Sequence, residues 1–257
     1  MSDLFHPAVP DEFIDQVFTA MLLAGDRYDE DGCNVVRPAQ TFIVLTKRAA
    51  RMQEYISRQI NDRNIWGDEL VMGRLGFGEH CGMEQDFVGD LLGVLMGNEP
   101  IRLPDRIWLG VTAEDQQRAD ERIPLLLQTP AAVRFVSCEP LLGPVEFSDV
   151  MHRSDCVRAL GKPAMKGIDW VIVGGETGAG ARPMHPDWAR SLRDQCQAAG
   201  VAFFFKQTGS ASTEFPGWGH GEKLLDGVEH HEWPGEQQER PVTAALPETT
   251  ALPGGTA

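Results

Sequence analysis

The chain has 257 residues, 42% of them hydrophobic, and a formal net charge of −15, which is the composition of a globular protein with one large core or two small ones. It contains no run of 18 apolar residues and no signal peptide at its start, so we expect no membrane span and a cytoplasmic protein. The acidic charge argues against non-specific binding to nucleic acid, although it leaves room for a local basic groove.

The cysteine pattern predicts no metal site. The five cysteines stand at 33, 81, 138, 156 and 196, and this wide spacing excludes C-x-x-C zinc sites and close-spaced iron–sulfur motifs within these residues. No H-E-x-x-H pattern occurs among the histidines. We interpret the cysteines as reduced thiols, with Cys138 and Cys196 in the core.

The first half of the chain predicts a helix, a loop and one strand–helix pair. Apolar residues at helical spacing over 11–22 predict a helix with Gly25 as its stop. Residues 26–39 are interpreted as a polar loop. The apolar run 41–45 predicts a strand, and a helix follows it directly. Residues 61–104 are rich in glycine and are interpreted as an insertion with one helix over Gln85–Leu95.

Four more apolar runs predict strands in the second half of the chain, at 107–111, 133–137, 170–173 and 201–205. A capping box over Thr112–Asp115 is expected to open a helix that Pro124 ends or kinks. Another helix is expected over 186–199, with Gly200 as its C-terminal stop. Residues 148–168 form a second polar insertion, and 235–257, which lack any apolar period, are expected to be a disordered tail.

The order of these elements predicts an α/β fold with a parallel sheet. The strands are continuously apolar, as strands buried on both faces are, and they alternate with helices. The pattern alone leaves open whether the sheet is a barrel or doubly wound. The strands are fewer than the eight of a complete barrel, and the chain opens with a helix that has no strand before it.

The loop after the strand 170–173 combines several groups that can bind a ligand. Gly174 and Gly175 end the strand, and Glu176 and Arg182 follow. Glycines at the carboxyl end of a strand let backbone N–H groups approach a ligand closely. The same glycines would equally serve a strand-to-helix connection that only relieves strain. The run matches neither G-x-G-x-x-G nor a P-loop.

Polar residues stand at the end of several predicted strands, and in a parallel sheet these ends share one edge. Together they could bind a zwitterion or another charged ligand, although each alone is equally an ordinary polar strand end. We expect Glu139, Glu176 and Lys206 to converge in one pocket. The candidate ligand-binding residues, called the rim residues below, are Asp3, Thr46, Lys47, Glu114, Glu139, Gly174, Gly175, Glu176, Arg182, Lys206 and Gln207.

Eight runs of the sequence resemble a phage-associated family of unknown function, often called the phage Gp-thirty-seven/Gp-sixty-eight family. It is similar to the radical S-adenosylmethionine superfamily, near spore photoproduct lyase. The runs are MSDLFH (1–6), VPDEFID (9–15), VLTKR (44–48), WLGVTAED (108–115), ADERIPLLLQTPAAVRFVSCEPLLGP (119–144), DWVIVGGETGAGARPMHPDW (169–188), FFFKQTG (203–209) and LLDGVEHHEWP (224–234).

The resemblance implies a partial, open (β/α) barrel of the TIM type over residues 1–234, with about six units. Members of the family begin with a strand and a three-cysteine loop that would hold a [4Fe–4S] cluster. The run at 1–6 matches a later point in such proteins. We therefore expect that this chain lacks the N-terminal unit, holds no cofactor of its own and cannot cleave S-adenosylmethionine reductively by itself. That cofactor and the cluster are implied only for a full-length form.

Three functions follow as alternatives. The chain is part of a radical-S-adenosylmethionine-like protein, whose rim residues help to hold that molecule or a substrate. Alternatively, it is a non-catalytic accessory or binding protein on the remaining barrel. A third candidate is a phosphate- or nucleotide-binding barrel protein that uses the loop at 174–180. Because missing strands leave a sheet edge unpaired, we also expect a marginally stable chain, a protein partner that covers the edge, and an in-frame cysteine motif upstream.

Overall fold

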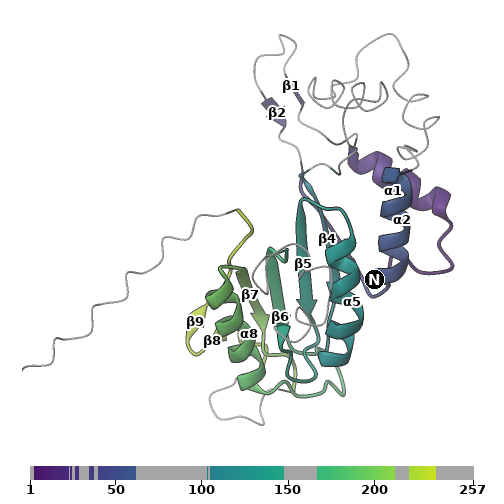
Figure 1. The fold of residues 1–257 in the computed structure, drawn as a ribbon. Coiled ribbons are helices and arrows are strands. Elements are labelled where there is room, and N and C mark those ends of the chain that lie inside the picture. The colour runs from purple at the N-terminus through teal and green to yellow at the C-terminus, as the bar shows by residue number, and fades with distance from the viewer. Residues whose placement is uncertain are drawn as a thin grey trace, which may run out of the picture.

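The computed structural model describes residues 3–22, 24, 27–28, 35–37, 40–61, 103, 105–147, 167–211 and 220–235. Nearly all of the two predicted insertions, 61–104 and 148–168, and all but the first residue of the predicted tail lie outside these residues. The described part is an α/β fold with a five-stranded sheet (Figure 1). Its strands are β3 (Phe42–Thr46), β4 (Ile107–Thr112), β5 (Val133–Cys138), β6 (Trp170–Gly174) and β7 (Ala202–Gln207). Its helices are α1 (Asp11–Leu22), α2 (Ala49–Asn61), α5 (Gln116–Gln128) and α8 (Pro186–Ala199).

The predicted parallel sheet is confirmed, and each predicted strand is present within two residues of its expected ends. The strand order is β3-β4-β5-β6-β7, and every pair is parallel. A doubly wound sheet reverses direction part-way through its strand order. Here each connection instead advances by one strand in the same direction, as in a (β/α) barrel. The sheet is open in the described part of the chain, where β3 and β7 are its edges.

Helices α2, α5 and α8 cover one face of this sheet (Figure 1). Alternate residues of each strand, such as Val44, Val136 and Phe203, share one buried cluster with helix residues such as Met52 and Leu192. Burial of each large apolar side chain contributes about 1.5–3 kcal/mol to stability. This cluster is the main core, and it lies between the sheet and the helices. The other face of the sheet points away from these helices.

Helix α1 packs mainly on α2, which explains how a helix with no strand before it is held. Ile14 and Phe18 are fully buried, and the Phe18 ring lies 5.8 Å from the Tyr55 ring of α2. The Tyr55 hydroxyl donates to the Asp15 carboxylate. The amphipathic pattern of α1 therefore reflects contact with a helix.

The predicted N-cap of α5 is wrong, and of the two effects expected of Pro124 the structure excludes one, the end of the helix. The N-cap is Asp115, whose carboxylate accepts from the Arg118 N–H at 2.9 Å, whereas Thr112 still pairs with Ser137 as part of β4. Pro124 does not end the helix, which continues to Gln128. A proline removes one hydrogen bond from a helix, and the burial of Ile123 and Leu126 on either side of it outweighs that loss.

Four short strands were not predicted. β1 (Arg27–Tyr28) and β2 (Val35–Arg37) pair within the expected loop 26–39. β8 (Leu224–Leu225) and β9 (Val228–Glu229) form a hairpin around Asp226 and Gly227, both with positive φ. An Asp-Gly pair between apolar residues is the sequence signal that could have predicted this hairpin.

The segment 230–232, called the return segment below, runs antiparallel along the outer edge of β7. The Phe205 N–H donates to the His230 carbonyl at 2.8 Å, and the Glu232 N–H donates to the Phe203 carbonyl at 3.2 Å. One edge of the sheet is thus covered by the chain itself. Of the described helices, none is long and apolar enough to cross a bilayer.

Candidate functional site

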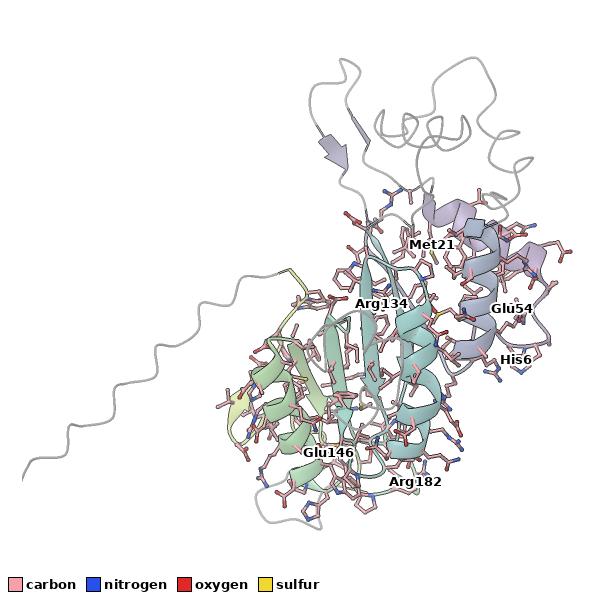
Figure 2. The ribbon with its side chains drawn as sticks, viewed as in Figure 1. His6, Met21, Glu54, Arg134, Glu146 and Arg182 are labelled. Carbon is pink, nitrogen blue, oxygen red and sulfur yellow. The ribbon has the colours of Figure 1, made fainter. Side chains whose placement is uncertain are left out.

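The rim residues stand at the carboxyl ends of the parallel strands, as expected, with Arg182 beyond the strand ends in Figure 2. Asp3 comes from the N-terminal segment and serves the fold. Its carboxylate accepts from the Thr46 hydroxyl at 2.6 Å, the Lys47 N–H at 3.0 Å and the Arg48 guanidinium at 2.7 Å. Burial opposes ionisation of Asp3, but these hydrogen bonds and one from the Phe5 N–H lower its pKa. Asp3 and Thr46 thus join the N-terminal segment to the end of β3.

Glu114, just after β4, lies between two cations. The Lys47 ammonium pairs with one carboxylate oxygen, and the Arg122 guanidinium pairs with the other at 2.8 Å. Arg122 also donates to the Thr112 carbonyl at 2.6 Å and is mostly buried, whereas the Lys47 side chain is 51% exposed. Burial opposes ionisation of Glu114, but Lys47 and Arg122 lower its pKa. Glu114 is therefore a carboxylate with a fixed inner partner and an exposed outer one.

Glu139, just after β5, has the same kind of arrangement. The Ser137 hydroxyl donates to one carboxylate oxygen at 3.2 Å, and the Lys206 ammonium of β7 pairs with the other at 3.1 Å. The Lys206 side chain is 56% exposed. Gly174 leaves the space that this carboxylate fills, since a Cβ on Gly174 would lie 2.6 Å from Glu139 Oε1. Of the three residues expected to converge, Glu139 and Lys206 thus meet, whereas Glu176 pairs with Arg182.

Gly175 and Gln207 hold the ends of β6 and β7 together. The Gly175 N–H donates to the Gln207 carbonyl at 2.9 Å. A Cβ on Gly175 would lie 2.1 Å from the Thr208 carbonyl oxygen, so a glycine is required for this close approach of two backbones. Gly174 lies level with Gln207 because the register shifts after Val173. These residues shape the carboxyl edge of the sheet.

Glu176 pairs with Arg182 of its own loop. The Arg182 guanidinium contacts both carboxylate oxygens, at 2.8 and 2.9 Å, and the Arg182 N–H donates to the carboxylate at 2.9 Å. These bonds lower the pKa of Glu176 to about 2. The Gly178 N–H donates to the Ser210 hydroxyl at 3.1 Å. The loop therefore uses these donors within the protein, which does not favour a phosphate cradle.

Two partners of the rim carboxylates were not among the residues predicted to bind a ligand. Arg122 lies within α5, eight residues after Glu114, and no local motif links the two. Ser137 is an ordinary polar residue near the end of a strand until the fold turns it toward Glu139. Both act as inner partners, so the site consists of two carboxylates that are each also paired with one half-exposed lysine.

The sequence profile of a family described as "Protein of unknown function (DUF5131)" matches residues 1–234. The chain belongs to this family. No curated protein and no solved structure matches the chain. The DUF5131 match covers every described strand and helix and all of the rim residues.

The described cysteines of this DUF5131 protein do not fit an iron–sulfur cluster. Cys138 and Cys196 are buried in the main core, and burial raises the pKa of both thiols, whereas a cluster needs thiolates. Within the described ranges no group of three His, Cys, Asp or Glu side chains could hold a metal ion. Cys33, Cys81 and Cys156 lie outside those ranges.

Proposed function

We propose that this DUF5131 protein binds a small zwitterionic molecule at the rim, and that the molecule is S-adenosylmethionine, in keeping with the resemblance to phage proteins of the radical S-adenosylmethionine type. One observation carries the proposal. On neighbouring strands, Glu114 and Glu139 each have an inner partner within the protein and an outer lysine that is about half exposed.

This arrangement suits a ligand that carries charges of both signs. A ligand cation can replace Lys47 beside Glu114, or Lys206 beside Glu139. The freed lysine can then pair with a carboxylate of the ligand, so that no charge is left without a partner. S-adenosylmethionine has an ammonium, a sulfonium and a carboxylate group. When bound, it supplies an activated sulfonium group, and the described residues account only for its binding.

The proposal covers binding, which an accessory protein and a catalytic barrel would share. A nucleotide is the rival ligand, and its natural site would be the loop at 174–180. The Glu176–Arg182 pair weighs against this, because the cation that a phosphate would need is already engaged by a carboxylate. ATP therefore serves below as the rival ligand in the binding experiment.

Titration calorimetry of the full chain with S-adenosylmethionine and, separately, with ATP tests the proposal. We expect S-adenosylmethionine to bind and Glu139→Gln to weaken its binding by about 1–3 kcal/mol, the usual loss for a charge-assisted hydrogen bond. Glu121→Gln is the matched control, because Glu121 pairs with Arg118 on the exposed side of α5. ATP binding that is insensitive to Glu139→Gln, or no binding of S-adenosylmethionine, would overturn the proposal.

A further inference from the structure

The face of the sheet opposite the helices carries a second, separate cluster of side chains. Phe135, Trp170 and Ala202 are its buried members, and they lie side by side on β5, β6 and β7. Five rings from four strands and the chain after β9 meet there. We call them the aromatic patch: Trp108, Phe135, Trp170, Phe204 and Trp233.

Trp170 is the centre of the aromatic patch. Its ring centroid lies 4.7 Å from that of Trp233 and 5.9–6.0 Å from those of Trp108, Phe135 and Phe204. Its side chain is almost completely enclosed, with 3% of the residue exposed. The indole ring is therefore held by contacts on several sides.

Among the residues that the structure describes, none supplies a hydrogen-bond acceptor to the Trp170 indole N–H, although this group is buried. The Trp108 indole N–H, by contrast, donates to the Asp105 carbonyl at 3.0 Å. Buried donors in folded proteins are nearly always paired, and an unpaired one calls for an explanation. An acceptor supplied by a bound molecule explains this one.

The aromatic patch can be reached from outside through Trp233. This residue is 40% exposed, and its ring makes the shortest of the four ring contacts with Trp170. It directly follows the return segment, which two backbone hydrogen bonds hold to the outer edge of β7. Moving the Trp233 ring aside leaves the five strands of the sheet paired as they are.

We infer that the aromatic patch is a binding site for a neutral, planar aromatic molecule with a carbonyl group, which displaces the Trp233 ring and accepts a hydrogen bond from the Trp170 indole. The lining explains each part of this class. Aromatic and apolar side chains bind planar apolar rings, the aromatic patch contains no charged side chain that could pair with an ionic ligand, and the unpaired donor requires an acceptor. The site begins four residues before the rim on β6, about 13 Å away, and the inference does not depend on the ligand proposed there.

A pair of probes of matched shape tests the inference with the full chain. 2-Quinolone is planar and has a carbonyl, whereas naphthalene has the same two-ring shape and no acceptor. In protein labelled with ¹⁵N at its six tryptophans, we expect saturation with 2-quinolone to move the Trp170 indole N–H resonance downfield. Naphthalene should leave the proton shift without this change.

For three variants the inference predicts whether binding of each probe becomes weaker or stronger. Trp170→Phe keeps a ring and removes the donor, so it should weaken 2-quinolone about tenfold and leave naphthalene unchanged. Trp108→Phe is the control, because its N–H is already paired, and it should affect both probes alike. Trp233→Ala removes the side chain that competes with the ligand and should strengthen 2-quinolone.

Three results would overturn the inference: equal affinity for both probes, an unmoved Trp170 resonance at saturation, or weaker binding of 2-quinolone to Trp233→Ala. If Trp170→Phe does not fold, two results still decide the question. One is the Trp170 resonance of the unmodified chain, assigned by elimination with single Phe variants of the other five tryptophans. The other is the sign of the Trp233→Ala effect.

Discussion

Asp3 was predicted to bind a ligand, but in the structure its carboxylate makes hydrogen bonds within the protein. It accepts hydrogen bonds from the Phe5 and Lys47 N–H groups, the Thr46 hydroxyl and the Arg48 guanidinium, across more than 40 residues of sequence. We expect Asp3→Ala to lower the free energy of unfolding by about 1–3 kcal/mol at pH 7, since four donors lose their acceptor. Urea denaturation measures this.

The pH dependence of the loss of unfolding free energy in Asp3→Ala is the control for this prediction. The folded-state pKa of Asp3 is lowered, so its contribution is fully present above the ordinary aspartate pKa of about 4 and is lost as pH falls through the lowered value. The difference between Asp3→Ala and the unmodified chain should therefore shrink in acid below that range. A difference that stays constant with pH would show that the charge of Asp3 does not matter.

At the scale of elements, the return segment closes one edge of the sheet. It brings His231 onto the Phe204 ring, 4.5 Å away, and is followed by Trp233 against Trp170. We expect a chain ending after residue 229 to lose about 3 kcal/mol or more of unfolding free energy, because ring contacts and two ladder hydrogen bonds disappear. Thermal and urea denaturation measure the loss.

A chain ending after residue 235 is the matched control for that truncation. Residues 236–257 lie outside the described ranges, and their composition, rich in Pro, Gly and Glu without an apolar period, predicts no contribution to the core. Its melting temperature should equal that of the full chain. A large drop would mean that these residues pack on the folded part.

At the scale of the whole molecule, the two edges of the sheet differ. The return segment covers β7, whereas β3 has β4 as its only neighbour among the described strands. Edge strands expose unpaired N–H and C=O groups. We expect native-state hydrogen exchange of the isolated chain to be faster on average in β3 than in β5, which lies between two strands.

Equal protection of β3 and β5 in the isolated chain would contradict this, because it would mean that the outer edge of β3 is already covered. If a protein partner covers that edge, as we propose from the sequence, adding it should slow exchange in β3 and leave β5 unchanged. Ile43, which is exposed on β3, then becomes protected in the complex.

The sequence by itself determined the five strands, the four described helices and the position of the rim. These features depend on neighbouring residues: runs such as Ile107–Val111 are apolar without interruption, and Gly200 stops its helix with a positive φ of 69°. Parallel strands then place Glu139 and Lys206 at the same edge, so their meeting could be predicted.

Only the tertiary structure decided which groups pair there and what lies on the other face of the sheet. Arg122 reaches Glu114 because α5 folds back over β4, and Asp3 is used by the β3 turn because α1 packs on α2. The contact between Trp233 and Trp170 joins residues more than 60 positions apart. Such contacts depend on the packing of whole elements against one another. They therefore cannot be predicted from local sequence patterns or from composition.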